Sequence, residues 1–239
     1  MSIPDILATT FHRTRKLPSG PWKYYQEWND ALFLHWEIPV DILRKSVPEN
    51  LKLDLFEGKA YVSLVAFTMQ KIRPKNLPAV AYISDFHEIN LRTYIKNDNK
   101  KGVYFLNIEA EKTLSAFIAR KMSGLPYGKS AINRANESYV SVNAEKGFSL
   151  DAQFEVREIV ADKSDLDKWL TERYCLYLDQ DKKMYRYEVH HKEWELKNVK
   201  INRLNLKYNI GEFSLPQETP ELVHYSEGVK VVAWGKEEA

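Results

Sequence analysis

The segment DFHEINLRTYI, residues 85–95, concentrates side chains that could bind a ligand or move a proton. Side chains alternate between the two faces of a strand, so one face of this segment would carry Phe86, Glu88, Asn90, Arg92 and Tyr94. A guanidinium can bind a carboxylate through two parallel hydrogen bonds, and a positioned carboxyl group can act as an acid or a base. A site for a small organic acid would use both groups.

Two interpretations of this polar face stay open. On a half-exposed antiparallel sheet the polar face simply meets water, which is the ordinary arrangement. If the sheet instead closes around a cavity, Arg92 would hold a carboxylate, Glu88 would orient the ligand or exchange a proton with it, and Tyr94 would close the pocket.

Lysine chemistry has one candidate beside this strand. The segment ARKMSGLPYGKS contains Lys121 and Lys129, and Lys129 is a candidate nucleophile. A lysine amine becomes nucleophilic near neutral pH when burial or a neighbouring cation lowers its pKa. Solvated charge on a helix face is the usual role of residues such as Arg120 and Lys121. Glu88 and Lys129 therefore stay the catalytic candidates.

Other chemistries find no pattern in the sequence. Six histidines are scattered without HxxxH spacing, and the adjacent His190 and His191 would point to opposite faces of a strand. Cys175 is the single cysteine, so the chain can form neither an intrachain disulfide nor a cysteine-based zinc site. The motifs GxSxG, GxGxxG and the P-loop do not occur. We therefore predict no metal site and no cofactor.

The composition argues against two classes of partner. The 239 residues carry a net charge of +2, with 35 basic and 33 acidic side chains mixed along the chain, so no basic stripe for a nucleic acid is expected. No apolar run approaches the roughly 20 residues of a membrane span. The lone cysteine and the lack of a signal peptide predict a reducing, cytoplasmic location.

The elements that must position the candidate side chains are mostly strands. Alternating patterns mark LKLDLF, KAYVSLVAFTM, residues 85–95, GVYFLNIEA and several later stretches. Glu57-Gly58 predicts a hairpin turn between LKLDLF and KAYVSLVAFTM, and the second of these is apolar on both faces, as a central buried strand would be.

Helices are few and short. Apolar spacing predicts a helix over TLSAFIARKM and another over SDLDKWLTERYCLY, which would begin at the N-cap Ser164 and contain Cys175. Many strands without βαβ alternation predict one mainly β domain over residues 1–239, an antiparallel barrel or sandwich with helices at its rim. Residues 1–21, with two prolines and a glycine near their end, are expected to form a loosely ordered N-terminal arm.

Several segments taken together resemble a known family. They are QEWNDALFLHWEIP, LDLFEGKAYVSLVAFTM, FHEINLRTYI, GVYFLNIEA, ARKMSGLPY, LTERYCLY and HKEWEL, in an order that spans Trp22 to Trp234. In this order and spacing the chain resembles the YqjF-like family of uncharacterised bacterial proteins. The fold of that family is similar to acetoacetate decarboxylase, a largely antiparallel β barrel with a central cavity and a few short peripheral helices. The decarboxylase uses a cavity lysine as a Schiff base, flanked by arginine and glutamate; neither Lys121 nor Lys129 is placed on its motif.

The resemblance implies that the polar face points into a closed cavity. The residues expected to line it are Glu88, Asn90, Arg92, Tyr94, His35, Trp36 and Tyr127. Three functions stay open: binding of a small acidic or carbonyl-containing molecule, a lyase or hydrolase reaction on a carbonyl compound, and a protein-interaction scaffold with a vestigial pocket. Exposed strand edges would also allow a homodimer.

Overall fold

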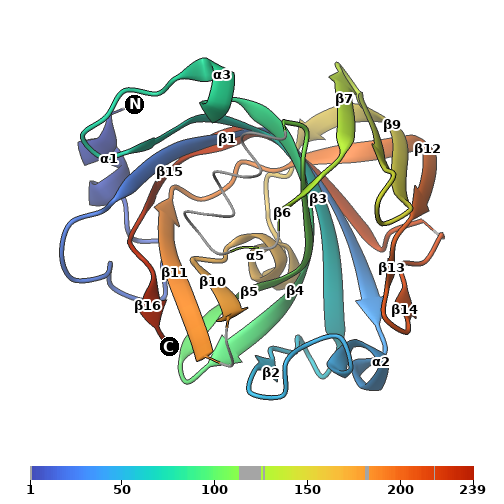
Figure 1. Ribbon diagram of the computed structural model, residues 1–239, viewed down its shortest axis with the longest axis horizontal. Coiled ribbons are helices and arrows are strands. Elements are labelled where there is room, and N and C mark those ends of the chain that lie inside the picture. The colour runs from blue at the N-terminus through green and yellow to red at the C-terminus, as the bar shows by residue number, and fades with distance from the viewer. Residues whose placement is uncertain (1, 113–124, 126, 181–182, 218) are drawn as a thin grey trace.

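The computed structural model describes residues 2–112, 125, 127–180, 183–217 and 219–239. Strands predominate, and the described helices are short (Figure 1). These helices are α1 (Ile3–Ala8), α2 (Val40–Arg44), α3 (Ala81–Ser84) and α5 (Asp165–Thr171). The prediction of a mainly β fold with short helices is confirmed. The helix predicted over residues 113–122 lies outside the described residues.

Seven strands pair with one another in a closed ring. In order around the ring they are β1 (Tyr24–Ile38), β3 (Ala60–Pro74), β4 (Phe86–Asn97), β5 (Lys100–Ala110), β10 (Cys175–Gln180), β11 (Lys183–His191) and β15 (Leu222–Ala233). The pairing of β11 with β15 closes the ring. All neighbours in it are antiparallel except β5 and β10, which pair in parallel.

The remaining strands extend the sheet beyond the ring or add short pieces to it. From β15 the order continues through β12 (Lys197–Lys207), β9 (Phe148–Ile159), β8 (Ser138–Asn143) and β7 (Ala131–Ala135). The short pieces are β2 (Lys52–Leu53) on β4, β6 (Tyr127–Lys129) on β5 and β16 (Glu237–Glu238) on β11. Strands β13 (Asn209–Ile210) and β14 (Phe213–Ser214) pair in a separate two-stranded sheet.

Strands β1, β3 and β4 are buried on both faces because each face packs against a different apolar core. On one face Leu34, Leu64 and Leu91 pack with side chains of β8 and β9, such as Tyr139 and Phe154. On the other face a second core faces the inside of the ring, and its members include Phe33, Val65, Phe67, Trp194 and Val231. The prediction that KAYVSLVAFTM forms a central, buried strand is confirmed by β3.

Three local predictions have mixed outcomes. Ser164 caps α5 with a reciprocal capping box to Asp167, as predicted. The helix ends at Thr171, however, and Cys175 begins strand β10 instead of lying in a helix. The Glu57-Gly58 turn forms, but the segment before it pairs with β4 through β2, so LKLDLF and β3 do not make a two-stranded hairpin.

The first 21 residues, which we expected to be loosely ordered, make specific contacts with the ring. Ile6 of α1 is buried against the end of β15. The His12 Nε2–H donates to the carbonyl oxygen of His191 at 2.8 Å, and Arg13 Nη1 donates to that of Val189 at 2.9 Å. This segment therefore lies against the backbone of β11.

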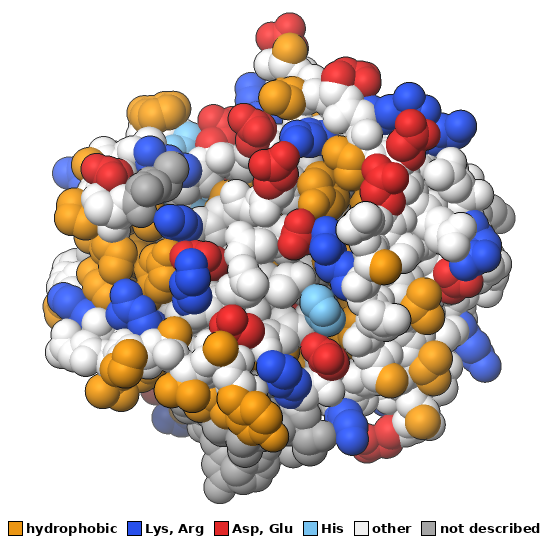
Figure 2. All heavy atoms as spheres, turned by 90° about the horizontal axis from the view of Figure 1, so that it is seen from above, with side chains coloured by type: hydrophobic (Ala, Val, Ile, Leu, Met, Phe, Trp, Pro, Cys, Tyr) orange, Lys and Arg blue, Asp and Glu red, His pale blue; other side chains and the backbone are white. Residues whose placement is uncertain are grey.

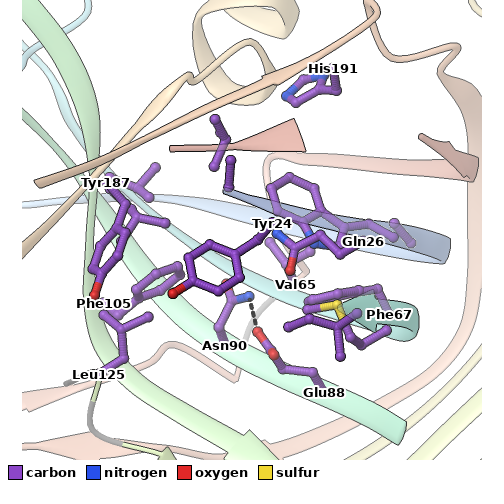
Figure 3. A pocket seen from close by; sticks show the side chains of 18 of the residues that line it. Tyr24, Gln26, Val65, Phe67, Glu88, Asn90, Phe105, Leu125, Tyr187 and His191 are labelled. Atoms are coloured by element: carbon purple, nitrogen blue, oxygen red, sulfur yellow. Dashed lines mark hydrogen bonds between the residues drawn. The ribbon is translucent and has the colours of Figure 1, made fainter. Parts of the chain in front are cut away.

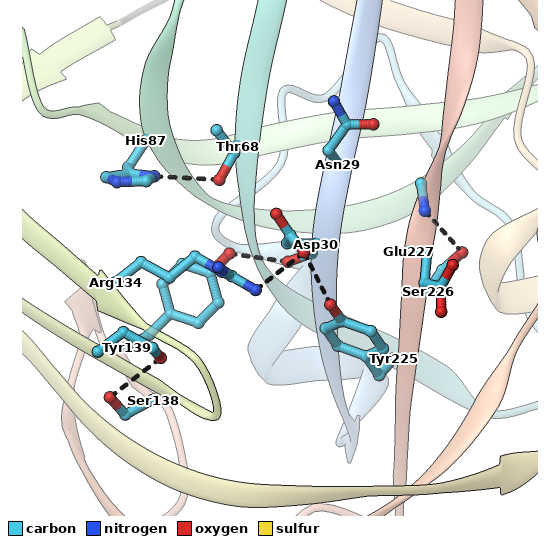
Figure 4. Close-up of polar contacts among 12 residues, drawn as sticks. Asn29, Asp30, Thr68, His87, Arg134, Ser138, Tyr139, Tyr225, Ser226 and Glu227 are labelled. Atoms are coloured by element: carbon cyan, nitrogen blue, oxygen red, sulfur yellow. Dashed lines mark hydrogen bonds and ion pairs between the residues drawn. The ribbon is translucent and has the colours of Figure 1, made fainter.

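A bulge in β1 fastens the outer strands to the ring (Figure 4). Asp30 sits there with a φ of 54°, in the left-handed region that aspartate tolerates better than most residues. Its carboxylate accepts from the Tyr225 hydroxyl and pairs with Arg134, both at 2.9 Å, and its carbonyl accepts from the Tyr139 hydroxyl at 2.7 Å. One residue thus contacts β7, β8 and β15.

The surface carries mixed charge. On the face in Figure 2, Lys and Arg side chains are interspersed with Asp and Glu side chains, without a stripe of one sign. Of the helices that the structure describes, none has the length and apolar character needed to cross a lipid bilayer.

Gly228 faces the same bulge from β15 and leaves no room for a side chain. A Cβ atom there would lie 2.4 Å from the Trp28 carbonyl oxygen and 2.5 Å from Asn29 Oδ1, at a φ of +134°. We expect Gly228→Ala to lower the free energy of unfolding by more than about 3 kcal/mol in urea denaturation. Gly58→Ala is the matched control, since it has a φ of +81° but open space, and should cost about 1 to 2 kcal/mol. Equal losses would contradict the steric argument.

Candidate functional site

A cavity of about 270 Å³ lies inside the ring. All seven ring strands contribute to its wall, and most of the wall is apolar and aromatic. The large apolar side chains include Trp28, Phe33, Phe67, Phe105 and Trp194. Buried apolar walls with a few polar groups are typical of small-molecule sites, because the walls exclude water and the polar groups orient the ligand.

Strand β4 supplies a row of polar groups to this wall. Its register with β3 sets Glu88 opposite Phe67, Asn90 opposite Val65 and Arg92 opposite Ser63. Directly opposite residues share a face of the sheet, so these three polar side chains point toward the cavity.

Glu88 is held by two neighbouring donors. Asn90 Nδ2 donates to Oε1 at 3.2 Å (Figure 3), and the Tyr127 hydroxyl donates to Oε2 at 2.9 Å. Burial disfavours the charged carboxylate and raises the pKa of Glu88 to about 7, although both hydrogen bonds act in the opposite direction. A carboxyl group with such a pKa can give or take a proton near neutral pH.

Arg92 has a guanidinium whose hydrogen-bonding capacity is incompletely used. Its Nε and Nη2 atoms are buried and have no hydrogen-bond partner among the residues that the structure describes, and the group lies 5.8 Å from the centre of the Phe33 ring. A buried cation without hydrogen-bond partners is costly, and an anion supplies both the opposite charge and the acceptors.

Arg173 adds a second guanidinium to the lining. It pairs with Asp54 at 2.7 Å and donates from Nε to the Trp169 carbonyl at 2.6 Å, while its Nη2 finds no hydrogen-bond partner within the described ranges. The guanidinium also packs on the rings of Trp169 and Tyr94, at 4.2 and 4.8 Å. Arg92 and Arg173 together leave several N–H groups for an acidic ligand.

His191 contributes an acceptor to the wall. Its Nδ1–H donates to the Lys192 carbonyl at 2.7 Å, which leaves Nε2 as the unprotonated nitrogen of a neutral ring. Burial lowers the pKa of His191 to about 3, so the ring accepts a hydrogen bond but is a poor base. Figure 3 shows His191 and Glu88 on opposite sides of the cavity.

Metal and thiol chemistry have no geometry to support them within the described part of the chain. There, no group of three or more His, Cys, Asp or Glu side chains is placed to hold a metal ion. Cys175 lines the cavity, but burial raises the pKa of its thiol to about 11, so it stays protonated near neutral pH.

Comparison with known proteins identifies the family. Residues 25–230 match DUF2071, a family of uncharacterized conserved proteins. The chain belongs to this family. It is also 36% identical to the uncharacterized protein YqjF of Bacillus subtilis (strain 168) over 226 residues, which make up 91% of this chain and 93% of YqjF. The YqjF-like resemblance seen in the sequence is confirmed.

Solved structures similar to this DUF2071 protein share its fold at low sequence identity. The enduracididine biosynthesis enzyme MppR complexed with pyruvate has a TM-score of 0.61 and 10% identity, covering 95% of this chain and 93% of its own. An acetoacetate decarboxylase-like enzyme from Sphingomonas wittichii RW1 has a TM-score of 0.58 and 15% identity, with coverage of 97% and 98%. An acetoacetate decarboxylase from Legionella pneumophila has a TM-score of 0.59 and 11% identity, with coverage of 94% and 90%. The expected likeness to the decarboxylase fold is confirmed.

The structure brings some of the expected lining residues of this DUF2071 protein together and separates others. Glu88, Asn90, Arg92 and Tyr127 all line the cavity. The other expected lining residues, Tyr94, His35 and Trp36, lie elsewhere, as does the candidate nucleophile Lys129.

Each of the displaced residues has a physical reason for its position. Tyr94 shares the face of Arg92 but lies beyond the cavity, beneath Trp169 at a ring distance of 4.5 Å. His35 lies behind Phe33, with which it stacks, and Trp36 belongs to the core on the opposite face of β1. Lys129 is exposed on β6, so the surroundings that would activate its amine are missing.

Two further lining residues, Arg173 and His191, were not predicted. Arg173 pairs with Asp54 and also lines the cavity. His191 was set aside because it adjoins His190. The two histidines do point to opposite faces of β11, and this places the His191 ring in the cavity wall. No local sequence pattern distinguishes His191 as a lining residue.

The raised pKa of Glu88 makes stability depend on pH. The carboxyl keeps its proton to about pH 7 in the folded protein and loses it near 4.5 in the unfolded chain. Between these values the folded protein binds more protons, so its free energy of unfolding falls as the pH rises. Relative to wild type, we expect Glu88→Gln to gain up to about 3 kcal/mol from pH 4.5 to about pH 8 in urea denaturation.

Glu49→Gln, a substitution at an exposed glutamate, serves as the control for this experiment. It should leave the pH dependence of the wild type unchanged. The same slope for Glu88→Gln and wild type would show that the Glu88 carboxyl ionises normally in the folded protein.

Proposed function

We propose that this protein binds a small organic carboxylate in the cavity of a closed β barrel. The observation that carries the proposal is Arg92, whose buried Nε and Nη2 lack hydrogen-bond partners in the described part of the chain, inside a largely apolar cavity. The carboxylate accepts from Arg92 and from Arg173 Nη2, and the rest of the ligand packs against the aromatic walls. The pairing of β11 with β15 supports the barrel.

The far end of the ligand meets Glu88. Glu88 and Arg92 are four residues apart on one strand, which is about 13 Å between Cα atoms for an extended chain. A ligand with a carboxylate at one end therefore presents a carbonyl or hydroxyl group toward Glu88 and Asn90. The protonated Glu88 donates to a carbonyl oxygen, and the carboxylate form accepts from a hydroxyl.

A keto acid satisfies both ends of this site. MppR, whose fold is similar, was solved as a complex with pyruvate, and acetoacetate decarboxylase shares the fold as well. These likenesses guide the choice of ligand, while the arginines and Glu88 of this chain supply the physical argument. Pyruvate, acetoacetate and phenylpyruvate are suitable probes because they vary the body behind a common carboxylate.

The alternative is a lyase or hydrolase reaction on a carbonyl compound. The pKa of Glu88 favours proton transfer, which either reaction needs. A Schiff-base mechanism also needs a lysine, and among the described residues that line the cavity none is a lysine. We therefore favour non-covalent binding. A cytoplasmic location, a homodimer and the scaffold role remain predictions.

Arg92→Ala tests the anchoring role. Loss of a charge-assisted hydrogen bond pair should weaken binding of a keto acid by about 10- to 100-fold, which isothermal titration calorimetry measures as an increased Kd. Arg157→Ala, at an exposed surface ion pair, should leave Kd unchanged. An unchanged Kd for Arg92→Ala, or failure of all three acids to bind the wild type, would argue against a carboxylate site at Arg92.

Borohydride reduction separates binding from Schiff-base chemistry. If the ligand is held by hydrogen bonds and packing, treatment of the protein with pyruvate and sodium borohydride adds no mass to the chain. Intact-mass spectrometry measures this outcome. A mass gain that peptide mapping assigns to a lysine would instead support the lyase alternative.

A further inference from the structure

A chain of buried polar side chains runs behind the two arginines. Asp167 of α5 lies 3.0 Å from His224 Nε2, and His224 Nδ1 lies 3.4 Å from His35 Nε2. His35 Nδ1 is 2.6 Å from the Ser63 hydroxyl, which also contacts the hydroxyl of Tyr94. We call these five side chains the relay chain.

The relay chain is bounded on both sides by a group that only accepts hydrogen bonds, namely the Asp167 carboxylate and the Leu170 carbonyl oxygen. At one end the Tyr94 hydroxyl donates to the carbonyl oxygen of Leu170 at 3.0 Å, and at the other end the Asp167 carboxylate faces His224. His35 and Ser63 are fully buried, and His224 is 4% exposed, so water cannot readily substitute for a missing partner.

The relay chain lies in register with the anion site. His35 on β1 is opposite Ser63 on β3, and Ser63 is opposite Arg92 on β4. Tyr94 lies under the guanidinium of Arg173, at 4.8 Å. The middle and one end of the relay chain are thus direct neighbours of the two cations that face the cavity.

The relay chain has one more hydrogen-bond contact than it has hydrogens. Its contacts are Asp167–His224, His224–His35, His35–Ser63, Ser63–Tyr94 and Tyr94–Leu170, which makes five. Neutral His224, His35, Ser63 and Tyr94 supply one hydrogen each, and the two ends supply none. A fifth proton supplies a hydrogen for every contact. A protonated His224 then donates to Asp167 and to His35. The donations continue in one direction, from His35 to Ser63, from Ser63 to Tyr94 and from Tyr94 to the Leu170 carbonyl.

The charges around the relay chain decide when that proton binds. Asp167 favours it, while Lys163 near His224, Arg92 near His35 and Arg173 over Tyr94 oppose it. Burial also lowers the pKa of both histidines. An anion bound at Arg92 and Arg173 removes part of the opposing positive potential, so it favours the protonated state.

We propose that the relay chain takes up one proton, held at His224, when a carboxylate occupies Arg92 and Arg173. The coupling rests on the carboxylate site proposed above. By linkage, binding of the acid tightens as the pH falls, and the bound acid makes protonation easier. The proton comes from solvent, and no covalent bond changes.

Calorimetry with pyruvate as the probe tests the coupling. Titrations in buffers of different ionisation enthalpy give the number of protons taken up, and a Glu88→Gln background removes the other carboxyl that could take one. We expect an uptake that rises toward one proton as the pH falls. Glu88→Gln with Ser63→Ala, or with His224→Gln, should lose most of that uptake. Ser141→Ala, a buried serine on β8, is the matched control and should retain it.

Ser63→Ala is informative because it removes two contacts and one hydrogen. The three remaining contacts then match the three remaining hydrogens, so the fifth proton is no longer needed. Binding of pyruvate with no proton uptake in the Glu88→Gln background would overturn the proposal. Uptake that Ser63→Ala leaves unchanged would also overturn it.

A measurement without ligand separates this proposal from the carboxylate site itself. Imidazole ¹⁵N shifts should show His35 and His224 changing together on acidification, with a lower midpoint in Ser63→Ala. Rings that stay neutral until the protein unfolds would exclude proton uptake by the relay chain. The rings could titrate as expected while pyruvate does not bind, or binds Arg92→Ala as tightly as wild type. That result would overturn the proposed function and the coupling that rests on it, but not protonation of the relay chain.

Discussion

The register of β4 between its neighbours is the constraint on which the site depends. A shift of one residue would exchange the two faces of the strand, bringing Ile89 and Leu91 into the cavity and Arg92 into the apolar core against Leu34 and Leu64. Because both faces of β4 are buried, such a shift would bury charged side chains in the apolar core and turn apolar side chains toward the cavity. The cost of that exchange keeps Glu88, Asn90 and Arg92 on the cavity side.

Three side chains that can carry a charge lie in the cavity wall, and burial of each charge costs free energy. Arg173 offsets its burial through the ion pair with Asp54 and by packing on aromatic rings. Glu88 avoids the cost of burial by keeping its proton to about pH 7. Arg92 does neither, since its buried Nε and Nη2 lack hydrogen-bond partners among the described residues. In the proposed function, a carboxylate bound at Arg92 would supply these partners and so offset this cost.

Local patterns in the sequence predicted those parts of the fold that depend on near neighbours. The alternation of residues 85–95 correctly grouped Glu88, Asn90 and Arg92, and the capping box at Ser164 marked the start of α5. The end of α5 was misjudged because the apolar spacing runs on into β10, where tertiary pairing with β5 and β11 decides the conformation. Both faces of β1 are buried, so its pattern does not reveal which one faces inward, and Trp36 lies in the core on the face away from the cavity.

Local patterns could not predict contacts between segments that are far apart in the sequence. Arg173 and His191 reach the cavity through pairings of β10 and β11 that no short stretch encodes. The relay chain likewise assembles from α5, β15, β1, β3 and β4. Each member, taken alone in the sequence, is an ordinary core or helix residue.

The two joints that hold the β10–β11 hairpin in the ring are short. On one side β10 meets β5 at two residue pairs, Leu176↔Val103 and Tyr177↔Tyr104, and on the other β11 meets β15 at three, from Val189↔Ala233 to His191↔Val231. Opening this wall of the cavity therefore breaks less main-chain pairing than opening any other. The N-terminal arm lies across the β11 joint, where His12 and Arg13 bond to its carbonyl groups. The first 21 residues therefore add side-chain hydrogen bonds to a joint that main-chain pairing holds at only three residue pairs.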